Sequence, residues 1–110
     1  MDYLKNIPQN TPVSLKETLK IHEGQLLSMA LSQVDNAQVV GFAVSAGEDI
    51  GEEAYLGDAL YLVLTGRTKI NRGDAEFEVS AGEAAAVPAK ESHALAFPVD
   101  STYIQITIFK

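Results

Sequence analysis

The chain has 110 residues, of which 46% are hydrophobic and 21% are charged, and its formal net charge at pH 7 is -7. This length suits one domain with a core of its own. The absence of cysteine excludes disulfides, thiolate nucleophiles and cysteine metal sites. The eight basic residues are scattered along the chain, so we expect no positive face of the kind that nucleic-acid binding requires.

No segment combines the basic start and the apolar run of a signal peptide, and no apolar stretch is as long as a membrane-spanning helix. A chain without cysteine is also compatible with the reducing conditions of the cytosol. We therefore expect a soluble, cytoplasmic protein with no nucleic-acid partner and no membrane partner.

Residues 1–24 are expected to form an N-terminal arm followed by a short helical turn. The first twelve residues contain two of the four prolines, which favours an extended arm. Ser14 stands three residues before Glu17, which is the spacing of a capping box at a helix N-terminus. No helical periodicity continues for long after it, so we expect one or two turns of helix and β-structure thereafter.

Residues 25–45 are predicted to form a β-hairpin. From residue 25 to residue 33, hydrophobic residues alternate with small or polar ones, as in a strand with one face on a core. Asp35 and Asn36 mark a turn, and residues 38–45 form the returning strand.

The centre of the sequence is an acidic, glycine-rich loop at residues 47–57, followed by a strand at residues 60–64. This strand, Leu-Tyr-Leu-Val-Leu, is hydrophobic at every position rather than at alternate ones. Strands of this kind are buried on both faces. We expect one face to turn into a closed or sandwiched core and a second copy of the chain to cover the other, which predicts a homodimer.

The second half of the chain continues with short strands separated by turns. The expected strands span residues 67–70, 75–79, 84–87, 94–97 and 101–109. With the earlier segments they make about eight or nine short strands, a pattern typical of a β-sandwich or barrel. The small residues from Ala84 to Ala86 fit either a narrowing barrel, where strands approach closely, or plain filler in a covered strand.

The spacing of glycine, proline and histidine resembles the two conserved motifs of the cupin superfamily. Gly47 and Gly66 frame the first motif, and the strand that ends at Gly66 is similar to the family's valine-leucine-x-glycine ending. Gly82, Pro88 and His93 stand at the spacing of the second motif. The two motifs together cover about half of the chain.

The resemblance implies the fold and the domain organisation. We expect an all-β protein with the double-stranded β-helix, or jelly-roll barrel, of two antiparallel sheets. Residues 1–110 would form a single cupin domain, with both motifs inside residues 47–97. The chain is most similar to small single-domain bacterial cupins with one conserved barrel, whose activities are largely unassigned.

The resemblance also implies where a metal would bind. In metal-binding cupins, two histidines and a glutamate of the first motif and the histidine of the second hold iron, manganese, nickel, copper or zinc. The first three positions are occupied here by Glu53, Tyr55 and Ala59, and only His93 keeps the family identity. Because Ala59 has no donor atom, the resemblance implies a degenerate metal site.

Glu53 and His93 each have two interpretations. Glu53 belongs either to a solvated acidic rim or to the barrel mouth. In the barrel mouth it would bind a metal through its carboxylate oxygens or transfer protons beside His93. His93 is either a packed, hydrogen-bonded residue or part of a cavity lining. A transition-metal site usually has three or four protein donors, so the expected cofactor is either none or a divalent transition metal held by Glu53 and His93.

Three functions follow. The first is binding of a small polar molecule in the barrel pocket, with Glu53, Tyr55 and His93 as ligand-binding residues. The second is a metal-dependent enzyme of the dioxygenase or isomerase type that uses Glu53 and His93. The third is a non-catalytic structural dimer module whose interior is filled by side chains. Without metal, Glu53 and His93 are also candidates for a general acid and base, with Tyr55 as a hydrogen-bond donor.

Overall fold

The computed structural model describes all 110 residues, and nearly every element in it is a strand. In chain order the elements are α1 (Leu15–Thr18), β1 (Leu26–Val34), β2 (Ala37–Val44), β3 (Asp49–Glu53), β4 (Asp58–Thr65), β5 (Arg67–Arg72), β6 (Ala75–Ser80), β7 (Ala84–Val87), β8 (His93–Ala96) and β9 (Ser101–Ile108). The predicted all-β fold class is confirmed.

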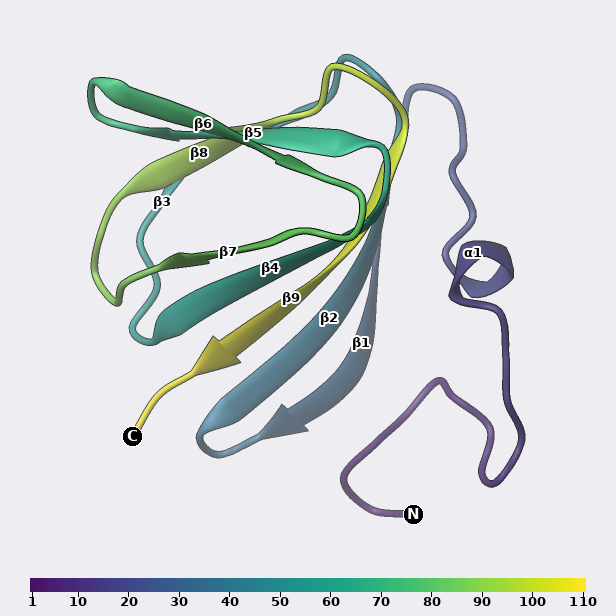
Figure 1. Cartoon of the computed structure of the whole chain (residues 1–110). Helices are drawn as coiled ribbons and strands as arrows, with labels where there is room; N and C mark the ends of the chain where they lie inside the picture. The colour runs from purple at the N-terminus through teal and green to yellow at the C-terminus, as the bar shows by residue number, and fades with distance from the viewer.

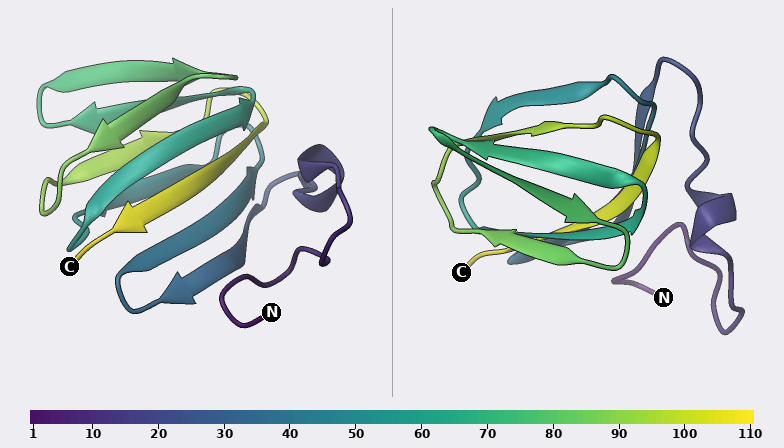
Figure 2. Two further views of the ribbon diagram at one scale, coloured as in Figure 1. Left: turned by 60° about the horizontal axis from the view of Figure 1, so that its bottom comes forward. Right: turned by 45° about the horizontal axis from the view of Figure 1, so that its top comes forward.

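The strands form two antiparallel sheets that face each other (Figure 1). One sheet has five strands in the order β1-β2-β9-β4-β7, and the other has four in the order β3-β8-β5-β6. The chain passes back and forth between the sheets and winds them into the predicted jelly-roll barrel, which Figure 2 shows from two further sides.

Alternate residues of β4 and β9 fill the space between the sheets. Tyr61 and Val63 of β4 are both at most 2% exposed, and Tyr103 of β9 is fully buried. The ring of Tyr103 stacks on Phe42 at a centroid distance of 4.7 Å and on Phe97 at 5.6 Å. Burial of a large hydrophobic side chain contributes about 1.5–3 kcal/mol. Aromatic packing thus holds the two sheets together.

The opposite face of β4 is only partly covered. Leu60, Leu62 and Leu64 point away from the core and are half-exposed. Their register places Leu60 beside Ile106 and Leu62 beside Ile104 on β9. One face of this strand is therefore buried within the chain, as predicted, while the other forms part of a hydrophobic outer surface of the five-stranded sheet.

The acidic stretch predicted as a loop contains the strand β3, so the prediction was wrong there. Asp49 to Glu53 includes few residues with a high strand propensity, and it becomes a strand through its pairing with the distant β8. After a register shift that follows Ile50, Glu53 lies directly opposite His93. This pairing positions the candidate site.

The predicted hairpin is confirmed, with a β-bulge that interrupts the expected alternation. Between Ala30 and Ser32 the register with β2 shifts, and Leu31 is the extra residue. The Leu31 carbonyl accepts a hydrogen bond from the Lys5 N–H at 2.9 Å, and the Asn6 side chain donates to the Ala30 carbonyl at 2.6 Å. The N-terminal arm therefore lies beside the edge strand β1 and satisfies some of its otherwise unpaired carbonyl groups.

The predicted helix start is also confirmed. The Ser14 hydroxyl accepts a hydrogen bond from the Glu17 N–H at 3.4 Å, and α1 is one turn long. No helix of the structure has the length and apolar character needed to cross a membrane. After α1, Leu19 packs on the outer face of β2 at Gly41, where a Cβ atom would lie 2.8 Å from the Leu19 side chain.

The turn between β4 and β5 requires glycine, and we predict that Gly66→Ala strongly destabilises the protein. Gly66 has a φ of 75°, and an added Cβ would overlap the backbone of Asp100. Because backbone strain and overlap add, urea unfolding should show a loss of about 2–4 kcal/mol. Gly51→Ala is the control, since nothing lies within 4 Å of its Cβ position, and it should change stability by less than about 1 kcal/mol. Equal losses in the two variants would contradict this account of the turn.

Candidate functional site

The three residues predicted to bind a ligand lie together at one end of the barrel. Glu53 faces His93 across the β3–β8 pair, and Tyr55 follows in the loop that leads to β4. The Tyr55 hydroxyl donates a hydrogen bond to Glu53 Oε2 at 2.6 Å, and its ring centroid lies 5.8 Å from that of His93. Glu53 is on the exposed rim, Tyr55 is half-buried and His93 is inside.

His93 is 3% exposed, and both of its ring nitrogens have partners. Nδ1 lies 3.0 Å from the backbone carbonyl oxygen of Glu91, which can only accept a hydrogen bond. Nδ1 therefore carries the proton in the neutral ring, and Nε2 has the lone pair. The Tyr61 hydroxyl lies 2.6 Å from Nε2 and donates to it. The imidazole is thus held in one tautomer by two hydrogen bonds.

Tyr61 was not among the residues predicted from the sequence to form the site. It lies on the inward face of β4, and its ring meets His93 edge-on, with centroids 5.7 Å apart. Its register partner on β9 is Gln105, which is also buried. The available signal was the phenol itself, because a tyrosine inside a hydrophobic strand needs a hydrogen-bond partner. Glu53, Tyr55, Tyr61, His93 and Gln105 together are called the polar cluster below.

One buried hydroxyl beside the polar cluster has no partner. Tyr103 precedes Gln105 by two residues on the same face of β9, and its ring centroid lies 6.0 Å from that of Tyr61. The Tyr103 hydroxyl makes no hydrogen bond within the protein. A buried polar group without a partner costs about 1–3 kcal/mol. The Tyr103 hydroxyl is therefore an unpaired hydrogen-bond donor that an additional acceptor would satisfy.

Arg72 places a positive charge near the buried imidazole. It lies on the inward-facing side of β5, beyond Ile70, which pairs with Leu95 of β8. Its guanidinium forms an ion pair with Glu91, the residue whose carbonyl accepts from His93. The ion pair thus holds Glu91 in place, and with it the backbone carbonyl to which Nδ1 of His93 is hydrogen-bonded.

Burial favours the neutral forms of the ionisable rings. It lowers the pKa of His93, and the nearby Arg72 adds to this effect while the Glu53 carboxylate opposes it. Burial also raises the pKa of Tyr61 and of Tyr103. The pKa of Tyr55 is raised by burial first and then by its hydrogen bond to Glu53. The interior therefore presents uncharged hydrogen-bonding groups.

The residues at the family's ligand positions do not make a metal site. Ala59 is 1% exposed and belongs to the hydrophobic core, so it supplies no donor. The chain has no group of three or more His, Cys, Asp or Glu side chains that could hold a metal ion together. Glu53 and His93 are two donors where three or four are usual, and Nε2 of His93 already accepts from Tyr61.

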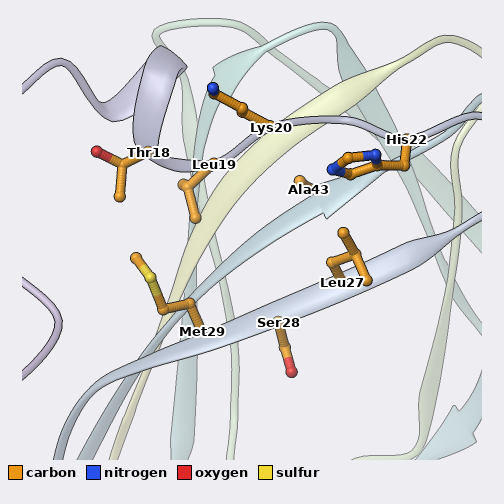
Figure 3. Close-up of a pocket in the computed structure, with 8 residues that line it drawn as sticks. All are labelled: Thr18, Leu19, Lys20, His22, Leu27, Ser28, Met29 and Ala43. Carbon is orange, nitrogen blue, oxygen red and sulfur yellow. The ribbon is translucent and has the colours of Figure 1, made fainter.

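The hollows of this structure lie away from the polar cluster. One of about 250 Å³ lies between the α1–β1 connection and the outer face of the five-stranded sheet, with Leu19, Leu27, Met29 and His22 in its wall (Figure 3). No residue of the polar cluster lines this hollow or any of the other four. Side chains thus fill the barrel around His93.

The buried imidazole predicts a specific dependence of stability on pH. Because the pKa of His93 is lowered in the folded state, its contribution is fully present above the ordinary pKa of 6.5 and is lost as the pH falls below it. The free energy of unfolding in urea should fall between pH 7.5 and pH 5.5 by more in the wild type than in His93→Gln. The exposed His22 is the control, and His22→Gln should keep the wild-type difference. If the free energy of unfolding of His93→Gln fell by as much as that of the wild type between pH 7.5 and pH 5.5, His93 would not be the cause of the pH dependence.

Comparison with solved structures identifies the family. The chain matches no protein-family model. No curated protein matches it. A cupin superfamily protein from Desulfitobacterium hafniense is 38% identical over 97% of this chain and 98% of its own, with a TM-score of 0.92. A conserved protein of unknown function from Streptococcus pyogenes is 25% identical over 100% of this chain and 96% of its own, with a TM-score of 0.95.

A third solved structure, a cupin 2 conserved barrel domain protein from Leptotrichia buccalis, is 29% identical over 86% of this chain and 46% of its own, with a TM-score of 0.82. The identity to the first of these proteins extends over nearly the whole length of both chains, so it shows common family membership as well as a common fold. The chain belongs to the cupin superfamily.

Proposed function

We propose that this small cupin binds a small, uncharged polar molecule at the polar end of the barrel, in contact with Glu53, Tyr55 and His93. The observation that carries the proposal is the Tyr103 hydroxyl, which is buried beside the polar cluster without a partner. The hydroxyls of Tyr55 and Tyr61 already donate to Glu53 and His93. Of these three phenols, only Tyr103 has a hydroxyl proton without an acceptor, and an oxygen of a bound molecule would accept it.

The charges around the cluster favour an uncharged ligand. An anion would approach the carboxylate of Glu53, which lies across the strand pair from His93, while the nearby positive charge of Arg72 is already paired with Glu91. A cation would find a single carboxylate and an imidazole whose lone pair is already engaged. Hydroxyl, carbonyl or amide groups instead match the phenols and the Gln105 amide.

Tyr55 is the residue that has to move to admit such a molecule. No cavity opens onto the polar cluster, and Tyr55 is its half-buried outer member. Its backbone is fixed, because its carbonyl accepts from the Lys90 N–H at 2.7 Å. Rotation of the Tyr55 side chain away from Glu53 would open the rim without moving the loop.

Binding without turnover is the activity that this arrangement supports best. A general base needs an unshared lone pair facing the substrate. In His93, Nδ1 donates to Glu91 and Nε2 accepts from Tyr61, so neither nitrogen is free. We therefore favour a binding protein over a metal-dependent dioxygenase or isomerase. The cytoplasmic location remains a prediction.

The experiment is an NMR titration of the protein with a panel of small sugars, polyols and amides. We expect at least one compound to shift the amide signals of Glu53, Tyr55 and His93. Tyr103→Phe should weaken its binding roughly 3- to 10-fold, the value of one hydrogen bond, while the free variant keeps or gains stability because it loses an unpaired hydroxyl. Tyr3→Phe, at an exposed phenol outside the barrel, is the matched control. If no compound binds, or if Tyr103→Phe binds as well as wild type, the proposal fails.

We also propose that two copies of the chain associate through the outer face of the five-stranded sheet. Support comes from the register that pairs Leu60 with Ile106 and Leu62 with Ile104, which makes a continuous hydrophobic surface on β4 and β9. Ile108, at the end of the same row, is 54% exposed. A second copy related by a twofold axis would bury this hydrophobic face.

Sedimentation velocity tests the dimer. The wild type should sediment as a dimer at micromolar concentration, and Ile106→Lys should sediment as a monomer because it places an ammonium group in the contact. Ala75→Lys adds the same charge on an exposed strand of the other sheet and should remain dimeric. A monomeric wild type would remove this proposal without touching the ligand site.

A further inference from the structure

The geometry points to Tyr61 as the residue that keeps metal ions off His93. The hydrogen bond between these two side chains would have this effect whether or not a small molecule binds at the barrel mouth. Tyr61 lies outside the family's set of ligand positions. It nevertheless occupies the space that a metal at this histidine would need.

The first step is that His93 has only one nitrogen to offer a metal. A neutral imidazole coordinates through its unprotonated nitrogen. Nδ1 lies 3.0 Å from the Glu91 carbonyl oxygen, which requires the proton to be there. Glu91 is in turn held by its ion pair with Arg72. Coordination therefore depends on Nε2.

The second step is that the Tyr61 hydroxyl and a metal exclude each other at Nε2. Histidine binds transition metals at about 2.0–2.1 Å from the nitrogen, along its lone pair. The Tyr61 oxygen sits 2.6 Å from Nε2 and donates its proton to the same lone pair. A metal can bind to His93 only if this hydroxyl leaves.

The third step is that Tyr61 is firmly held. It is 0% exposed, and its ring lies against both His93, at a centroid distance of 5.7 Å, and Tyr103, at 6.0 Å. Its displacement would break a buried hydrogen bond and leave a void among packed aromatic rings. Ala59, two residues earlier on the same face of β4, offers no donor in compensation. On β4, therefore, Ala59 supplies no metal ligand, and Tyr61 blocks the nitrogen through which His93 would bind a metal.

The test removes the hydroxyl and keeps the ring. In Tyr61→Phe, the buried Nε2 loses its partner and is free to coordinate, with Glu53 across the strand pair as the second donor. We follow the ring nitrogen signals of His93 by NMR during titration with zinc chloride at pH 7. We expect the Nε2 signal of Tyr61→Phe to respond at a zinc concentration at least tenfold lower than in the wild type.

Tyr103→Phe is the matched control. It also removes a phenol oxygen from the inward face of the barrel, but Tyr103 makes no hydrogen bond to His93. Its Nε2 signal should respond to zinc as in the wild type. A double variant, Tyr61→Phe with Glu53→Gln, should lose most of the gain, since only the imidazole remains as a donor.

Either of two results from the zinc titration would overturn the inference. One is a wild-type Nε2 signal that responds to stoichiometric zinc, because the hydroxyl would then exclude nothing. The other is a folded Tyr61→Phe variant with no gain over the wild type. If the Tyr61→Phe variant does not fold, the NMR spectrum of the wild type still tests whether the Tyr61 hydroxyl keeps zinc off Nε2. A slowly exchanging hydroxyl proton coupled to Nε2, unchanged at tenfold excess of zinc, supports the inference, and its absence overturns it.

Discussion

A single hydrogen bond across the barrel, from the Tyr61 hydroxyl to Nε2 of His93, sets the chemistry of this protein. Tyr61 lies on β4 of the five-stranded sheet and His93 on β8 of the four-stranded sheet, so the bond joins the two layers. It fixes the imidazole tautomer together with the Glu91 carbonyl. It also occupies the lone pair of Nε2, the unprotonated nitrogen of His93, so that the buried rings around His93 present uncharged hydrogen-bonding groups.

The strand β4 contributes to both the interior of the barrel and its outer surface, because its side chains point alternately inward and outward. Tyr61 and Val63 face inward and complete the aromatic interior, while Leu60 and Leu62 face outward beside β9. A strand that is hydrophobic at every position is needed only when both surfaces are covered. The proposed ligand binding inside the barrel and the proposed association on its outside would therefore be separate properties, although both involve β4.

Much of the fold was predictable from the sequence, and part of the site was not. Glycine, proline and turn spacing predicted the jelly-roll, since those residues mark backbone positions that few others can adopt. The strand β3 was missed because its acidic residues do not favour a strand and its partner lies far along the chain. Tyr61 was missed because a strand that is hydrophobic at every position does not reveal which of its residues face inward. Its hydrogen bond to His93 also joins residues that are 32 positions apart in the sequence. Glu53, Tyr55 and His93 were singled out as candidates by motif spacing, which predicts that they lie close together but not which hydrogen bonds they make.

The most direct measurement is a crystal structure of the wild-type protein grown with zinc, with anomalous diffraction recorded at the zinc absorption edge. We expect the Tyr61 oxygen at hydrogen-bond distance from Nε2 of His93, with no anomalous peak on that nitrogen. An anomalous peak bonded to Nε2, with the Tyr61 side chain turned away, would contradict it.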